Sequence, residues 1–163
     1  MIIVKKAGYL VFKESKFRCS FGKNGIGIKK EEGDGITPRG IFKLTKIFYR
    51  EDKVKNIKTR INKVKIKKNM GWCDDPKSKF YNKLIKLPSK FSHEKLYRKD
   101  NIYNIVIVLN YNMDPIIKNK GSAIFIHVAK KNYKATQGCI SLKQKELIKL
   151  IQIVKRNQKI RII

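Results

Sequence analysis

Two apolar runs in the second half of the chain limit the folds that it can adopt. They are IYNIVIVLNYN at residues 102–112 and SAIFIHVA at residues 122–129. Their apolar stretches have the length of strands, and their nearly continuous apolar character indicates burial on both faces. Neither is long enough to cross a membrane as a helix. We therefore expect a mainly β domain in which these two segments are central strands.

Further strands are predicted on both sides of this centre. Residues 2–6 and 9–13 flank Ala7 and Gly8 as a hairpin, and β-branched and aromatic residues mark strands at 17–22 and 40–50. KIRII at residues 159–163 indicates a closing strand. Residues 53–70 fit neither the helical nor the strand period, so we expect an extended, exposed segment there.

One helix is predicted near the C-terminus, where apolar residues recur at helical spacing: Leu147, Leu150, Ile151 and Val154. Ser141 and Gln144 fit a capping box that begins the helix at Leu142. No linker or internal repeat divides the 163 residues, which is the length of one ordinary domain. We expect a single domain over residues 1–163.

The charge is strongly one-sided, with 40 lysines and arginines against 12 acids and a net charge of +28. A nucleic-acid groove would need these cations concentrated on one stripe. They run instead from Lys5 to Lys159, which favours a generic basic surface. A nucleic-acid-binding module stays an alternative, although RNP-like aromatics, a helix-turn-helix pattern and zinc fingers are missing from the sequence. We expect no specific nucleic-acid partner.

The start of the chain reaches two lysines after four residues and contains no apolar run of the length found in secretory signals. From the sequence as given we expect neither a signal peptide nor a transmembrane segment. The three cysteines, Cys19, Cys73 and Cys139, match no zinc-binding spacing, so we expect no metal site and no cofactor. A disulfide between Cys19 and Cys73 stays open.

Cys139 has the surroundings of a nucleophile. Gly138 permits a sharp turn that presents N–H groups to a carbonyl, and a helix start two or three residues later would lower the pKa of the thiol. The chain has two histidines, His93 and His127. His127 ends an apolar strand twelve residues upstream, and a returning loop can bring the two together. A structural histidine beside a buried cysteine is the alternative.

The segment HVAKKNYKATQGCISL, residues 127–142, is similar to the signature of the L,D-transpeptidase (YkuD-type) catalytic domain family, in which a strand histidine precedes an S/T-x-G-C turn. GDGITPRGIFKL, residues 33–44, resembles the G-x-x-TPxGxF stretch of the same family. The stretch GWCDDPKSKFYNKLIKLP, residues 71–88, is similar to a proteobacterial branch without an obvious signal peptide. The order of the two motifs makes the resemblance specific.

This resemblance implies a β-sandwich or barrel-like domain with a helix after the catalytic cysteine, and acyl transfer on peptidoglycan stem peptides. Cys139 would be the nucleophile that forms a thioester, and His127 the general base, oriented by a backbone carbonyl such as that of Val128. The N–H groups of Gly138 and Cys139 would bind the oxyanion. Transfer to an amine would make a cross-link, whereas transfer to water would make an L,D-carboxypeptidase or a related amidase.

The resemblance also implies a bacterial cell-wall enzyme that contributes to cell shape, lies in the periplasm and is acylated by carbapenems. A cytoplasmic role on recycled muropeptides stays open. Two positions depart from the family pattern, since Gln137 replaces a histidine and Ser141 an arginine. Gln137 can still hydrogen-bond to substrate. Other cations are then needed to hold a substrate carboxylate, and the candidates are Lys130, Lys131, Lys134 and Arg39.

The loop that begins with GWCDDP is predicted to line the substrate pocket, through Trp72, Asp74, Asp75 and Tyr81. Either aspartate can receive the cationic amine of a diaminopimelate acceptor. A turn around a packed tryptophan is the alternative. His93 fits either the same pocket or the surface. Cys73 is interpreted as structural, because adjacent aspartates raise the pKa of a thiol.

Overall fold

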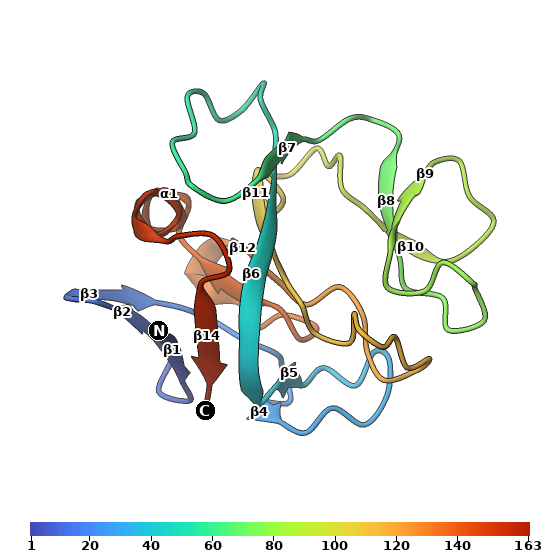
Figure 1. Ribbon diagram of the computed structural model, residues 1–163, viewed down its shortest axis with the longest axis horizontal. Helices are drawn as coiled ribbons and strands as arrows, with labels where there is room; N and C mark the ends of the chain where they lie inside the picture. Colours follow the sequence, from blue (N-terminus) through green and yellow to red (C-terminus); the bar gives the residue numbers. More distant parts are fainter.

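The computed structural model describes all 163 residues and contains fourteen strands, one α-helix and one short 3-10 helix (Figure 1). In chain order the elements are β1 (Ile2–Lys5), β2 (Tyr9–Phe12), β3 (Ser15–Arg18), β4 (Ile26–Gly27), β5 (Thr37–Pro38), β6 (Gly40–Tyr49), β7 (Lys63–Lys65), β8 (Met70–Cys73), β9 (Leu84–Lys86), β10 (His93–Lys95), β11 (Ile105–Leu109), β12 (Phe125–Val128), η1 (Lys131–Tyr133), β13 (Ile140–Leu142), α1 (Gln144–Ile153) and β14 (Lys159–Ile162).

Nine strands form the main sheet, in the order β13-β12-β11-β6-β14-β1-β2-β3, with β7 paired to β6. Ser20, just after β3, forms an antiparallel bridge with Ser141 of β13, and each backbone N–H donates to the other's carbonyl, at 3.0 and 2.9 Å. This bridge brings the two ends of the sheet together and nearly closes it into a barrel. The predicted mainly β, barrel-like fold with a C-terminal helix is confirmed.

The two apolar runs form β11 and β12, which are neighbours in the sheet and are buried on both faces. Because side chains alternate along a strand, successive residues enter two different cores. Ile107 and Ile126 belong to the larger core, together with Leu147 of α1. Val106 and Phe125 belong to a smaller core. The prediction that these segments are central strands is confirmed.

The helix α1 buries Leu147, Leu150 and Ile151 against the larger core, but its predicted start is wrong. It begins at Gln144, after Lys143, and no side chain caps it. Residues 140–142 stay extended because they pair in parallel with β12. The Ser141 hydroxyl lies 2.6 Å from the hydroxyl of Ser20 instead of capping the helix. No helix is long and apolar enough to span a membrane.

The prediction of an exposed segment over residues 53–70 holds for most of its lysines but is wrong for its apolar residues. Val54, Ile57 and Ile61 are buried in the larger core, and Ile66 is buried in the smaller one. Only residues 63–65 of this stretch join a sheet before β8 begins at Met70. Most of the segment packs as irregular chain, so its apolar residues follow neither regular period.

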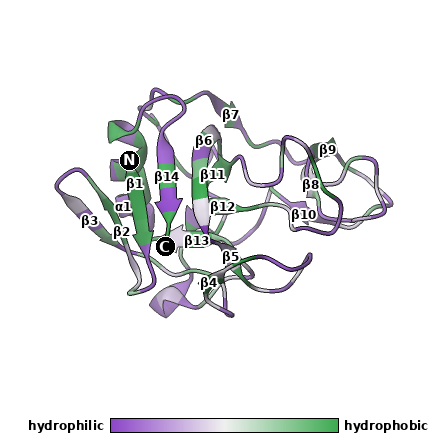
Figure 2. Ribbon diagram, turned by 60° about the horizontal axis from the view of Figure 1, so that its bottom comes forward, coloured by the Kyte–Doolittle hydropathy of each residue, from purple (hydrophilic) through white to green (hydrophobic).

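The first and last strands lie side by side, since β14 pairs in parallel with β1 and antiparallel with β6. Ile160 and Ile162 of β14 are buried, whereas Lys159 and Arg161 are exposed, and this alternation is visible as green and purple along β14 in Figure 2. KIRII is therefore a strand as predicted, although it lies inside the sheet.

A separate three-stranded sheet, in the order β10-β8-β9, stands beside the main sheet (Figure 1). Trp72 of β8 packs edge-on against Phe48 of β6 and Phe125 of β12, with ring centroids 6.4 and 5.3 Å apart. The smaller core thus joins the two sheets. Strands β4 and β5 form a two-stranded sheet that leads into β6.

Candidate active site

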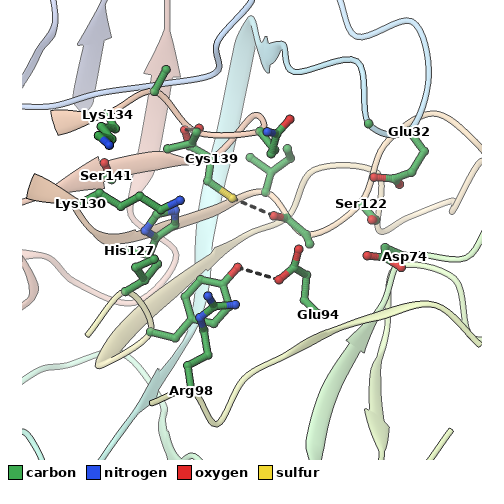
Figure 3. Close-up of a pocket in the computed structure, with 18 of the residues that line it drawn as sticks. Glu32, Asp74, Glu94, Arg98, Ser122, His127, Lys130, Lys134, Cys139 and Ser141 are labelled. Carbon is green, nitrogen blue, oxygen red and sulfur yellow. Dashed lines mark hydrogen bonds between the residues drawn. The ribbon is translucent and has the colours of Figure 1, made fainter. Parts of the chain in front are cut away.

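A cavity of about 440 Å³ is lined by residues of both sheets and of the loop before β13, including Cys139 and His127 (Figure 3). Strand geometry brings these two residues together. Ser141 lies opposite His127 in the parallel pairing of β12 and β13, and Cys139 is two residues before Ser141. Residues two apart share a face of a sheet, so Cys139 and His127 lie on the same side.

A network of hydroxyl groups holds the turn that carries Cys139. The Thr136 hydroxyl donates to the Cys139 carbonyl at 2.5 Å and accepts from the Gly138 N–H at 3.1 Å. From β5, the Thr37 hydroxyl donates to the Gly138 carbonyl at 2.8 Å. Gly138 has φ +135°, and a Cβ there would lie 2.9 Å from the Ile36 carbonyl oxygen. The turn therefore requires glycine for both its conformation and its packing.

The thiol of Cys139 is neutral in this state. It donates to the Ala123 carbonyl at 3.1 Å, and the Phe125 N–H donates to the sulfur at 3.4 Å. Burial raises the pKa of Cys139 to about 12, although part of the residue is accessible from the cavity. The predicted lowering of this pKa is wrong, because β13 separates Cys139 from α1 and protein atoms surround the sulfur.

His127 is buried and also neutral. Its Nδ1 lies 2.9 Å from the Val128 carbonyl, the orienting group that the sequence predicted. A proton on Nδ1 donates to that carbonyl and leaves Nε2 with a free lone pair. Burial lowers the pKa of His127 to about 4. The Tyr103 ring packs edge-on against the imidazole, with centroids 5.5 Å apart. The site therefore presents an unprotonated base beside a protonated thiol.

Charged groups of opposite sign line different parts of the cavity. Lys130 and Lys134 lie on the His127 side in Figure 3, whereas Glu32 and Asp74 lie on the opposite side. Of the four cations proposed to hold a substrate carboxylate, Lys130 and Lys134 line the cavity, and Lys131 and Arg39 do not.

The family model for the YkuD L,D-transpeptidase catalytic domain matches residues 1–162. The chain belongs to this family. No curated protein sequence matches it.

Two solved structures share the fold of this L,D-transpeptidase family member. Bd1075 of Bdellovibrio bacteriovorus is 14% identical, with a TM-score of 0.54 over 100% of this chain and 47% of that one. An L,D-transpeptidase from Mycobacterium smegmatis is 12% identical, with a TM-score of 0.50 over 99% of this chain and 57% of that one. The chain spans about half the length of both proteins.

Both motifs of the L,D-transpeptidase resemblance meet at the turn that carries Cys139. Thr37 belongs to the TPRG motif, and its hydroxyl also accepts from the Gly22 N–H at 2.8 Å. That hydroxyl thus joins the loop after β3 to the turn before β13. Threonine in the motif was the signal for this contact, although Thr37 was not among the predicted site residues.

Of the predicted substrate-binding residues, only Asp74 and Gln137 line the cavity. Trp72 is buried in the smaller core, where its indole N–H donates to Asn82 Oδ1 at 3.0 Å. Asp75 accepts from the Lys77 N–H at 2.9 Å and so stabilises a turn.

Tyr81 and His93 also lie outside the cavity lining. The buried Tyr81 donates from its hydroxyl to Glu32 at 2.5 Å and accepts from the Gly121 N–H at 2.9 Å. His93 is partly buried, with Nδ1 2.6 Å from the Phe91 carbonyl. Its neighbour in β10, Glu94, lines the cavity instead, because successive side chains of a strand point to opposite faces. Strand alternation was the signal that distinguishes the two.

All three cysteines are free, so no disulfide joins Cys19 and Cys73. Cys19 lies in the larger core, where burial raises its pKa to about 12. Cys73 is fully buried in β8. Cys139 is the one cysteine that lines the cavity shared with His127.

Proposed function

We propose that the protein is a cysteine acyltransferase that cross-links peptidoglycan stem peptides through a thioester on Cys139. The observation that carries this proposal is the shared cavity of Cys139 and His127, with the thiol on a turn that Gly138 and Thr37 hold. Family membership supports peptidoglycan as the substrate class. Because that polymer lies outside the inner membrane, we place the reaction in the periplasm.

In the first half-reaction the thiol hydrogen leaves the Ala123 carbonyl and passes to Nε2 of His127 while sulfur attacks the substrate carbonyl. The pKa of the thiol, about 12, lies far above that of the imidazole, about 4. A separate thiolate and imidazolium are therefore unfavourable, and proton transfer accompanies formation of the C–S bond. His127 then acts as general acid and gives the proton to the departing amine as the C–N bond breaks.

The oxyanion formed on attack needs positioned N–H donors. The Cys139 N–H donates no hydrogen bond in the structure and is the donor directly available. The Gly138 N–H donates to the Thr136 hydroxyl at 3.1 Å. When the oxyanion forms, this N–H gives up that bond and donates to the oxyanion instead. In the second half-reaction an acceptor amine attacks the thioester, loses a proton to His127 and releases the thiol.

Substrate groups outside the reacting bond are assigned by charge. Lys130 and Lys134 hold a substrate carboxylate in place of the arginine that the family carries at the position of Ser141. Gln137 lines the cavity immediately before the turn and offers an amide to the substrate backbone.

The test is incubation with a disaccharide-tetrapeptide, followed by mass spectrometry of the products. A cross-linked dimer supports transpeptidation, and loss of the terminal residue without a dimer identifies an L,D-carboxypeptidase. No change in the substrate, from a folded protein, overturns both.

A second experiment identifies the nucleophile. Imipenem or meropenem should add once, on Cys139, and the Cys139→Ala variant should stay unmodified. Iodoacetamide at pH 7 should react slowly, because a thiol with a pKa of about 12 carries little thiolate. A drug adduct on Cys73 would make GWCDD the catalytic segment and contradict the proposal.

A further inference from the structure

One wall of the cavity is acidic in a chain that is otherwise strongly basic. Glu32, Asp74 and Glu94 all line the cavity, although the whole chain has only 12 acids against 40 lysines and arginines. Figure 3 shows Ser122 between Glu32 and Asp74, with Glu94 nearer to Cys139. We call these four residues, Glu32, Asp74, Glu94 and Ser122, the acidic wall.

The carboxylates of this wall have no cationic partner. The four ion pairs of the structure use other acids, namely Asp34, Asp52, Glu51 and Asp100. Two of the cations that line the cavity are already engaged: Lys29 pairs with Asp34 at 2.5 Å, and Arg98 pairs with Asp100 at 2.7 Å. With so many cations available elsewhere, this unpaired negative charge is a local feature of the cavity.

Two buried acceptors in the wall lack a donor. Ser122 is 5% exposed and its hydroxyl has no hydrogen-bond partner. Oδ1 of Asp74 is likewise buried without a partner. Buried polar atoms are nearly always hydrogen-bonded, so unpaired acceptors that line a cavity indicate a ligand that brings donors. Each remaining carboxylate receives one hydroxyl, Tyr81 to Glu32 and Tyr103 to Glu94, at 2.5 and 3.3 Å.

The ligand chemistry follows from these acceptors. No group of three or more His, Cys, Asp or Glu side chains is arranged to hold a metal ion. A primary ammonium group carries one positive charge and three N–H donors, which suits Asp74 Oδ1, the Ser122 hydroxyl and Glu94. Burial and the charge of Asp74 raise the pKa of Glu94, and a bound cation would relieve that repulsion.

We propose that the acidic wall is a subsite for the side-chain ammonium group of a diamino acid in the donor peptide, the one whose carbonyl Cys139 attacks. This inference rests on the proposed function. Ser122 directly precedes Ala123, and the Ala123 carbonyl accepts a hydrogen bond from the Cys139 thiol. The subsite therefore adjoins the nucleophile. The donor is favoured over the acceptor because carboxylates stabilise the protonated amine, whereas an attacking acceptor amine must be unprotonated.

The test measures binding without turnover, in the Cys139→Ala background. The ligands are Nα-acetyl-L-lysyl-D-alanine and Nα-acetyl-L-norleucyl-D-alanine, which differ in the ammonium group. Isothermal titration calorimetry should find the lysine peptide bound roughly 10 to 100 times more tightly, the range expected for charge-assisted hydrogen bonds. The net charge of +28 opposes such a preference, so only local acids can produce it.

Charge-removing variants then locate the preference. Glu94→Gln and Asp74→Asn should each bring the affinities for the lysine and norleucine peptides to within about threefold of one another. Ser122→Ala should reduce the ratio of these affinities less. Glu51→Gln is the matched control, because this exposed carboxylate pairs with Lys65 and lies outside the cavity lining. It should leave the ratio unchanged. Circular dichroism on each variant verifies folding.

Two results would overturn the subsite: equal affinity for the two peptides, or a lysine preference that survives both Glu94→Gln and Asp74→Asn. A third arm tests the donor assignment, by measuring release of D-alanine from each peptide by the Cys139-containing protein. Faster release from the lysine peptide supports the donor assignment, and equal release from the two peptides contradicts it. If neither peptide is cleaved but the binding preference persists, the proposed function fails and the subsite stands.

Discussion

The molecule contains two cysteine–histidine pairs, and only one of them lines the candidate active-site cavity. In the small sheet, Cys73 of β8 lies directly opposite His93 of β10. In the main sheet, Cys139 shares a face with His127. Each histidine has Nδ1 close to a backbone carbonyl, at 2.6 Å for His93 and 2.9 Å for His127. The two pairs therefore resemble one another in composition and in the anchoring of the base.

They differ in the space and the donors around the sulfur. Cys73 is fully buried and does not line the candidate active-site cavity, and its N–H donates to the Lys83 carbonyl at 2.9 Å. Cys139 lines the cavity, follows a glycine at φ +135°, and has an N–H that donates no hydrogen bond. A thiol beside an imidazole thus becomes a candidate nucleophile only where a carbonyl can reach it and a free donor awaits the oxyanion.

The largest effect should come from exchanging the cysteines for alanine. Cys139→Ala should reduce turnover to background, because no other group can form the thioester. The melting temperature of this variant should stay within a few degrees of the wild-type value. Cys73→Ala should keep the rate and lose stability, by about 1–2 kcal/mol, because it leaves a small void in β8. Turnover by folded Cys139→Ala, measured on a muropeptide, would refute the distinction between the two pairs.

Exchanging the histidines should give the next largest effect. His127→Gln should lower kcat by about two to four orders of magnitude, the usual value of a positioned general base. His93→Gln should change kcat less than about threefold, since His93 does not line the cavity. Steady-state kinetics on both variants make the comparison. Equal losses would show that His93 takes part in the reaction.

Acid stability should separate the same two histidines. The folded pKa of His127 is about 4, below the ordinary value of 6.5, so between these values the unfolded chain binds a proton that the folded chain does not. Stability therefore falls as the pH falls from 6.5 towards 4, by about 3 kcal/mol over the interval.

His127→Gln should remove this part of the pH dependence, and His93→Gln should retain it. Urea unfolding at pH 7, 5.5 and 4.5 measures both. Comparing variant with wild type cancels the contribution of the carboxylates, which titrate in the same range. A wild-type slope in His127→Gln would mean that the imidazole is not held neutral.

The elements that could be predicted from the sequence are those whose signal is local. Nearly continuous apolar residues identified β11 and β12, and the family motifs located Cys139 and His127. The prediction of exposure for residues 53–70 failed because irregular chain can bury residues such as Val54 and Ile57 without any periodic apolar pattern. The prediction that Ser141 caps the helix failed because Ser141 pairs with β12 and forms a bridge to Ser20, and both partners are distant in the sequence. These long-range pairings override a local capping pattern.

The substrate residues show the same limit at the scale of single side chains. Of the two adjacent aspartates predicted for the pocket, Asp74 lines the cavity and Asp75 does not; His93 was predicted as well, but its neighbour Glu94 lines the cavity instead. A shift of one residue along an extended chain reverses the face, and the sequence alone does not say which face is the inner one. Ser122 carried no signal, because an unpaired hydroxyl is recognisable only when its surroundings are known.

The smallest effect tests what holds the Cys139 turn. Thr37 is fully buried, and its hydroxyl joins the Gly22 N–H to the Gly138 carbonyl, both at 2.8 Å. Thr37→Val keeps the shape but leaves both groups unpaired, so it should cost about 1–2 kcal/mol of stability and lower kcat about tenfold. Thr37→Ser retains the hydroxyl and should restore most of the rate. Thr45→Val is the control, since it removes a hydroxyl that donates to Val108 at 3.1 Å in the sheet, and it should leave kcat unchanged. If Thr37→Ser is as slow as Thr37→Val, packing of the methyl group rather than the hydrogen-bond bridge positions the nucleophile.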